Sequence, residues 1–92
     1  MSVLVRIPTP LRALTNGRGD VQVEAATVKE MFDQIEKDFA GLKGRLREDD
    51  GTVRRFINVY VNEEDIQFLQ GMSTGLKPGD EVFIVPAMAG GR

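Results

Sequence analysis

The chain contains no cysteine, no histidine and no tryptophan. Without cysteine it forms no disulfide, holds no iron–sulfur cluster and offers no thiolate nucleophile. Without histidine it lacks the commonest general base and the commonest transition-metal ligand. Nucleophilic triads, zinc sites and haem ligation by these residues are excluded. We therefore expect that the chain is not an enzyme, and that a partner supplies the catalytic groups for any chemistry it joins.

An excess of positive charge and long apolar runs are missing as well. The chain has 12 basic and 14 acidic residues and a formal net charge of −2. Nothing in this balance favours contact with a phosphate backbone, so nucleic-acid binding is not expected. The apolar stretches are too short to cross a bilayer, and Arg6 interrupts the first of them, unlike a secretory signal. We expect a cytoplasmic monomer that binds neither nucleic acid nor membrane.

The first third of the chain predicts a hairpin. Residues 3–7 alternate, with Val3, Val5 and Ile7 on one face, and residues 21–24 alternate again. A glycine-rich turn at residues 16–20 lies between them, although the connection is longer than a tight hairpin needs. Two antiparallel strands are the expected result.

An amphipathic helix follows the hairpin. Thr27 and Glu30 have the spacing of a capping box, in which a hydroxyl caps the helix start and a carboxylate follows three residues on. Gly41 is the expected stop. Apolar side chains recur at helical spacing between these points: Val28, Met31, Phe32, Ile35 and Phe39.

The second half predicts further strands. Residues 55–62 are the strongest strand signal, with Ile57, Val59 and Val61 facing the helix. Leu42 and Leu46 are expected to hold the charged loop before this strand against the core. A proline–glycine turn at residues 77–80 leads into a strand at residues 81–86. A right-handed crossover through the helix makes the strands on either side of it parallel if they share a sheet.

This order predicts an α+β domain: a mixed four- to five-stranded sheet with one main helix packed on one face. It fits the β-grasp, or ubiquitin-like, architecture. We expect residues 1–86 to form this domain and residues 87–92 to form a flexible C-terminal tail. The tail has the sequence Met88-Ala89-Gly90-Gly91-Arg92 after Ala87, and glycine pairs weaken local structure. A backbone without Cβ atoms is narrow enough to enter a slot in another protein.

The tail and the segments before it resemble the ThiS/MoaD sulfur-carrier family. The resemblance rests on the turn and strand at residues 77–82, on Val85-Pro86 and on the Ala89-Gly90-Gly91 ending. Residues 55–66 look most like the branch that serves cysteine biosynthesis, and residues 5–12 are similar too. The likeness thus covers nearly the whole chain.

The resemblance implies a chemistry carried by the main chain. A ubiquitin-activating-type adenylyltransferase uses ATP to adenylate the terminal glycine, here Gly91, and sulfide or a persulfide displaces AMP to leave a thiocarboxylate. In the cysteine branch a pyridoxal-phosphate enzyme then accepts the sulfur, and a metal-dependent peptidase releases the amino acid. Met88, Ala89 and Gly90 would enter the partner's slot. The carrier itself is expected to bind no cofactor.

Arg92 departs from the family pattern, because Gly91 is not the encoded terminus. Similar carriers with extra terminal residues are trimmed by a peptidase, and we expect Arg92 to be removed in the same way. The alternative is that Arg92 marks a carrier that lost its activity.

Two surface features are weighed against simpler interpretations. Phe56, Tyr60, Phe83 and Val85 are predicted to share the sheet face opposite the helix and to dock partners, unless residues 42–51 or 66–76 cover them. The acidic runs at residues 48–50 and 63–65 are interpreted as solvated turns and not as metal sites.

Three other functions remain open at this point. One is the small subunit of molybdopterin synthase or the thiazole carrier, which use the same kind of tail with other acceptors. Another is a ubiquitin-like modifier joined to protein lysines through Gly91. The last is a plain interaction domain with a vestigial tail.

Overall fold

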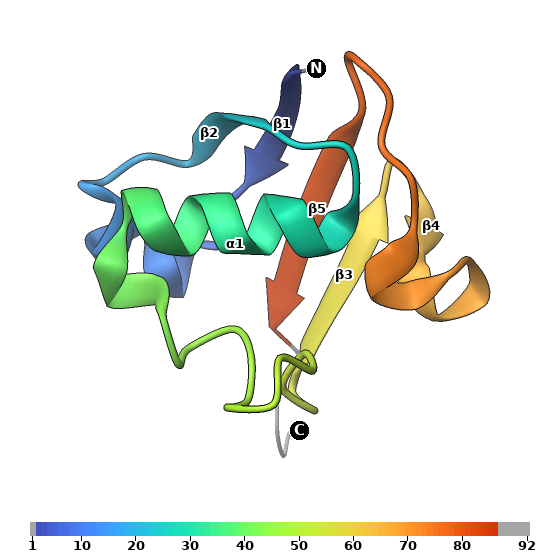
Figure 1. Cartoon of the computed structure of the whole chain (residues 1–92). Coiled ribbons are helices and arrows are strands. Elements are labelled where there is room, and N and C mark those ends of the chain that lie inside the picture. The colour runs from blue at the N-terminus through green and yellow to red at the C-terminus, as the bar shows by residue number, and fades with distance from the viewer. Residues whose placement is uncertain (1, 87–92) are drawn as a thin grey trace.

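The computed structural model describes residues 2–86, which form a five-stranded mixed sheet with one α-helix lying across one face (Figure 1). The strands follow the order β2-β1-β5-β3-β4 across the sheet. The predicted β-grasp fold is confirmed. The elements are β1 (Ser2–Arg6), β2 (Asp20–Glu24), α1 (Val28–Asp38), β3 (Ile57–Val61), β4 (Glu64–Asp65) and β5 (Glu81–Pro86), with 3₁₀ turns at Thr9–Thr15, Ala40–Leu42, Ile66–Phe68 and Gly71–Ser73.

Strand β5 lies in the middle of the sheet. It pairs in parallel with β1 and antiparallel with β3, while β1 and β2 form the predicted antiparallel hairpin. It follows that β2 and β3 run in the same direction, as the crossover through the helix predicts.

The core lies between α1 and the inner face of the sheet. Alternate residues of each long strand point into it, which is the expected period of two. Val59 and Val61 are 2% and 6% exposed, and Ile57 packs against the same cluster at partial burial. The helix contributes Val28, Met31, Phe32 and Ile35, all fully buried. Leu42 and Leu46 are also fully buried, so the prediction that they hold the charged loop to the core is confirmed.

The predicted helix cap is present in a slightly altered form. The Thr27 hydroxyl accepts a hydrogen bond from the Glu30 N–H at 3.2 Å, and the Glu30 carboxylate accepts one from the Ala26 N–H at 3.0 Å. The carboxylate therefore reaches one residue further back than in a standard capping box.

The predicted helix stop at Gly41 is wrong. The helix ends at Asp38, and Phe39 leaves the helical region with φ −131° and ψ 88°. Gly41 lies inside the next 3₁₀ turn, where an added Cβ would come within 3.2 Å of Leu14 Cδ2. The 3₁₀ turn places Leu42 in the core, and Gly41 lies close to Leu14 within it.

The two predicted strands of the second half are present, and one of them is shorter than predicted. The strand expected at residues 55–62 spans Ile57–Val61, and the strand expected at residues 81–86 is β5. In the turn before β5, Gly79 has φ +88° and the Asp80 N–H donates to the Lys77 carbonyl at 3.0 Å. Among residues 2–86, no helix has the length and apolar character needed to cross a membrane.

Candidate docking site at the end of strand β5

The residues with the predicted chemistry lie outside the described part of the chain. Met88, Ala89, Gly90, Gly91 and Arg92 all follow Pro86, the last residue of β5. The described structure therefore defines the base to which this segment is attached. That base is the central strand, held by β1 on one side and β3 on the other. A partner that binds residues 87–91 is thus connected directly to the middle of the folded core.

The predicted docking residues gather on the outer face of β3 and β5. Tyr60 lies opposite Phe83, and Val85 lies opposite Asn58, in the antiparallel register of these strands. Val85 is 41% exposed, and Tyr60 and Phe83 are half-buried. All three side chains point away from α1, because their strand neighbours point into the core.

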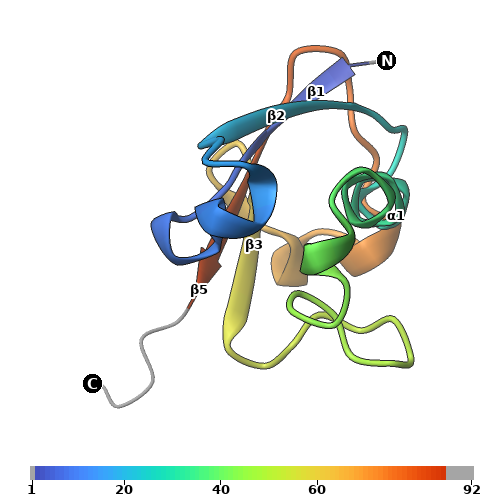
Figure 2. The same cartoon turned by 90° about the vertical axis from the view of Figure 1, so that its left-hand side faces the viewer.

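The segments that were considered as covers pack mainly on the helix side of the sheet. Figure 2 shows α1 and residues 42–51 and 66–76 on one side of the sheet. The buried side chains of Leu46 and Leu76 belong to the core beneath α1, and the Val28 N–H donates to the Thr74 carbonyl at 3.0 Å. Phe68 of the second segment nevertheless lines a surface groove together with Tyr60, so this segment borders the predicted docking residues at one end.

Phe56 lies at the place where β5 ends. It comes immediately before Ile57, which pairs with Pro86, the last residue of β5. The residue is 53% exposed, and the guanidinium carbon of Arg55 lies 5.4 Å from its ring centroid. Phe56 belongs to no strand, so it does not share the strict alternation of β3.

The other half of the outer face is charged. Arg6 of β1 lies 3.1 Å from the Glu81 carboxylate and 3.5 Å from that of Asp20. These ion pairs are exposed and contribute little to stability. Together with the exposed Gln22 on β2, they make the outer face polar over β2, β1 and the start of β5, whereas Tyr60, Phe83 and Val85 form its apolar part.

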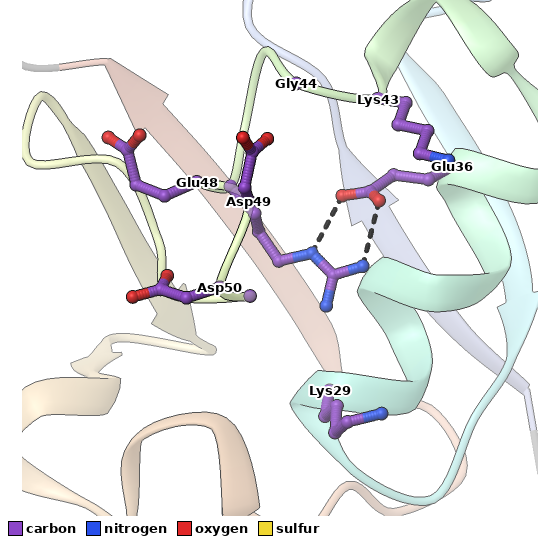
Figure 3. A pocket seen from close by; sticks show the side chains of 9 residues that line it. Lys29, Glu36, Lys43, Gly44, Glu48, Asp49 and Asp50 are labelled. Carbon is purple, nitrogen blue, oxygen red and sulfur yellow. Dashed lines mark hydrogen bonds and ion pairs between the residues drawn. The ribbon is translucent and has the colours of Figure 1, made fainter.

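A surface pocket of about 380 Å³ lies on the helix side, and it holds a structural ion network (Figure 3). Arg47 donates to both carboxylate oxygens of Glu36 and, at 2.9 Å, to Asp33. The hydrogen bond to Glu36 raises the pKa of Arg47. Hydrogen bonds from Lys29 and then from Arg47 lower the pKa of Asp33.

The acidic run beside this pocket shows no convergent geometry. The carboxylates of Glu48, Asp49 and Asp50 do not meet at one point in Figure 3. Asp50 instead accepts hydrogen bonds from the N–H and hydroxyl of Thr52, at 3.0 and 2.7 Å, which lower the pKa of Asp50. Within residues 2–86, no group of three potential ligand side chains could hold a metal ion. In the same range, no buried polar side-chain atom lacks a hydrogen-bond partner.

Two features were not found from the sequence. The ion network around Arg47 joins residues 11 and 14 positions apart, a spacing that no helix or strand period marks. Phe68 is 86% exposed, more than any other large apolar residue in the described range. Phe68 follows the acidic residues 63–65, and no sequence pattern there predicts that its side chain is exposed.

The strand order and the helix α1 across one face of the sheet define a ubiquitin-like protein of the β-grasp class. Its central strand, β5, precedes the diglycine ending in the sequence. The comparisons with known proteins agree. The model of the ThiS family matches residues 5–91, and the chain belongs to this family.

Individual relatives extend the match to the whole chain. The sulfur carrier protein CysO of Mycobacterium tuberculosis is 40% identical over 93 residues, covering 99% of this chain and 100% of the relative. The crystal structure of the Amycolatopsis orientalis BexX/CysO complex contains a chain with a TM-score of 0.89 and 47% identity, covering 97% of this chain and 99% of that one. Small archaeal modifier protein 3 of Haloferax volcanii is 42% identical over 66 residues, covering 72% of this chain and 71% of the relative. The chain is thus similar to CysO sulfur carriers along its full length.

Proposed function

We propose that this chain carries sulfur as a thiocarboxylate on Gly91, for the biosynthesis of cysteine or a related sulfur amino acid, after removal of Arg92. The observation that carries the proposal is the extent of the family match, which runs from residue 5 through Gly91 and leaves out Arg92. CysO of Mycobacterium tuberculosis, a relative that matches over its whole length, is named a sulfur carrier.

The proposed reaction takes place at one main-chain carbonyl. The Gly91 carboxylate attacks the α-phosphorus of ATP on a ubiquitin-activating-type adenylyltransferase, which forms an acyl-adenylate and releases pyrophosphate. Sulfide then attacks the carbonyl carbon, and AMP leaves as the C–S bond forms. If a persulfide attacks instead, a thiol must afterwards cleave the S–S bond of the resulting acyl disulfide, which leaves the thiocarboxylate and a new disulfide. The thiocarboxylate is itself a nucleophile, so a chain without cysteine is sufficient for the task.

Sequence and geometry support such an encounter. Five residues beyond Pro86 reach Gly91, and an extended chain of that length spans about 16 Å, enough to enter a buried active site. Glycines at positions 90 and 91 allow close approach by the enzyme that loads sulfur and by the one that accepts it. We propose that Phe56, Tyr60, Phe83 and Val85 dock these partners, because they form the apolar surface beside the exit.

The proposed partners follow from the chemistry. The adenylyltransferase supplies ATP binding, a pyridoxal-phosphate enzyme accepts the sulfur, and a metal-dependent peptidase removes Arg92. The related CysO of Amycolatopsis orientalis occurs in a complex with BexX, which supports stable docking of a carrier of this kind on another protein.

Mass spectrometry tests the proposal. The chain ending at Gly91 is incubated with ATP, sulfide and the adenylyltransferase from the same genome, and the expected product has sulfur in place of one oxygen. The full chain with Arg92 is the matched control and should stay unmodified. Failure of the shorter chain to gain sulfur would contradict the carrier role. Protein from native cells that never ends at Gly91 would contradict trimming.

A second candidate is a ubiquitin-like modifier joined to protein lysines through Gly91. The similarity to small archaeal modifier protein 3 favours it. Covalent ladders on other proteins in the presence of ATP and the adenylyltransferase would support this function.

A further inference from the structure

A second surface feature lies where β3, β4 and the 3₁₀ turn Ile66–Phe68 meet. It is a groove of about 370 Å³. Its lining combines two aromatic rings with three carboxylates: Tyr60, Glu63, Glu64, Asp65 and Phe68. Neither the fold nor the proposed sulfur chemistry uses this groove.

The ring of Phe68 is exposed although its backbone is firmly held. The neighbouring Ile66 is 6% exposed and belongs to the core. The Asp65 carboxylate accepts a hydrogen bond from the Gln67 N–H at 2.8 Å, and the Leu69 N–H donates to the Ile66 carbonyl at 3.0 Å. A ring on a fixed backbone loses little conformational entropy when a partner covers it, and removing its apolar surface from water favours binding.

The hairpin that forms the other wall is also fixed. Asn62, between β3 and β4, adopts φ +58°. Its side-chain oxygen accepts a hydrogen bond from the Glu81 N–H at 3.1 Å, and its side-chain nitrogen donates to Asp80 at 3.2 Å. The turn that carries Glu63 is therefore tied to the start of β5, and the groove is preorganised.

The charge of the groove is negative. Glu63 and Glu64 are exposed, and no lysine or arginine of the described chain forms an ion pair with them or with Asp65. Two rings beside three carboxylates match the chemistry of an arginine or lysine side chain, whose stem packs on the rings while its cationic head meets the carboxylates.

The groove is continuous with the proposed docking surface through Tyr60. This residue lines the groove and also lies opposite Phe83 on the outer face. The groove lies at the end of β3 that carries Val61, which pairs with Glu64 of β4. The end of β5 lies at the opposite end of β3, where Ile57 pairs with Pro86. The two ends are about 13 Å apart at the usual rise of a strand.

We propose that this groove receives an arginine or lysine side chain of the adenylyltransferase that loads Gly91. Apolar contact on the outer face has no strong directional preference. A charged contact at the far end of the strands sets the rotation of the carrier on the enzyme, so that the chain beyond Pro86 points into the active site. This inference rests on the proposed function.

Binding of the purified adenylyltransferase to the full chain tests the proposal, with Phe68→Ala and Glu63→Lys compared with wild type. Each change should raise Kd by about tenfold, because a central aromatic anchor and a close charge pair are the costly contacts to lose. The effect of Glu63→Lys should shrink at high salt, since mobile ions screen the charge. Thermal melting should show both variants folded, because both side chains are exposed.

Asp49→Lys is the matched control, since it makes the same charge change on an exposed residue outside the groove. It should alter Kd by no more than about twofold. Groove variants that bind like wild type, while the wild-type chain ending at Gly91 is still loaded with sulfur, would overturn the inference and leave the proposed function standing. A wild-type chain ending at Gly91 that gains no sulfur would overturn the proposed function and the inference with it. If wild type self-associates and Phe68→Ala abolishes this, the occupant is a second copy of the chain and the proposal is wrong.

Discussion

Arg47 donates two hydrogen bonds to the carboxylate of Glu36, from Nε to Oε2 at 2.9 Å and from Nη2 to Oε1 at 2.8 Å. The two side chains are 12% and 11% exposed, and the Arg47 guanidinium carbon lies 5.4 Å from the ring centroid of Phe32. This pair connects the loop after α1 to the polar side of the helix. The loop also leads to Phe56 and to the start of β3, so the pair helps to position the surface beside the end of β5.

Removing the Glu36 charge should destabilise the domain. Glu36→Gln should lower the free energy of unfolding by about 1.5 kcal/mol, because Arg47 loses a charge-assisted partner in a poorly solvated place. Urea denaturation followed by circular dichroism measures the change. Lys29→Met is the control: it breaks the exposed 2.9 Å ion pair with Asp33 and should cost less than about 0.5 kcal/mol. Equal losses in the two variants would contradict a special role for the Arg47–Glu36 pair.

Stability should fall in acid partly through Asp33. The hydrogen bond from Lys29, followed by that from Arg47, holds the pKa of Asp33 below its value in the unfolded chain. The resulting stabilisation is present above about pH 4 and is lost as the pH falls through the lower, folded-state pKa. Asp33→Asn should therefore lose less unfolding free energy than wild type between about pH 5 and pH 2.

The size of this acid effect should be small. The Asp33 side chain is 48% exposed, so the difference between the two proteins should stay below about 1 kcal/mol. Asp49→Asn, which removes an exposed carboxylate without a hydrogen bond in the described structure, is the matched control. Acid profiles of Asp33→Asn and wild type that coincide would show that these hydrogen bonds do not act in solution.

A charge on the apolar half of the outer face should block docking. Val85→Asp, made in the chain ending at Gly91, should reduce the rate of sulfur loading by about tenfold, because an unpaired carboxylate is costly to bury against a partner. Its melting temperature should change little, since Val85 is 41% exposed. Gln22→Asp adds the same group to the exposed polar half of that face and should load normally. Normal loading of Val85→Asp would exclude the predicted docking surface.

A methyl group at the reactive position should separate folding from function. Gly91→Ala, made in the chain ending at residue 91, should melt like its parent, because residue 91 lies beyond the last core strand. ATP–pyrophosphate exchange by the adenylyltransferase should fall by at least about tenfold, since the added Cβ enters a slot shaped for glycine. A clear loss of thermal stability would instead mean that this residue supports the fold.

The alternation of apolar residues was enough to predict most of the fold. Val3 and Val5, or Val59 and Val61, must share one face because a strand places alternate side chains on opposite sides. The same rule predicted that Tyr60 lies on the face opposite the helix. The helix was predictable because its apolar stripe and its Thr27 cap are local signals.

The limits of the elements were less predictable. Gly41 looked like a helix stop, but the helix ends at Asp38 and Leu42 of the following turn is buried in the core. Residues 71–73, for which no element was predicted, form a 3₁₀ turn. Propensity is a weak prior for such limits, because tertiary context often overrides it.

The amino-acid order by itself determined a β-grasp core and a diglycine ending, on which the proposed main-chain chemistry of a chain without cysteine or histidine depends. Only the tertiary structure decided that Tyr60 lies opposite Phe83, that Arg47 meets Glu36, and that Phe68 and Glu63 line one groove. Periodicity assigns each residue to a face of its own element. Contacts between residues of different elements depend on how strands and loops pack together, and the periodicity within one element does not predict them.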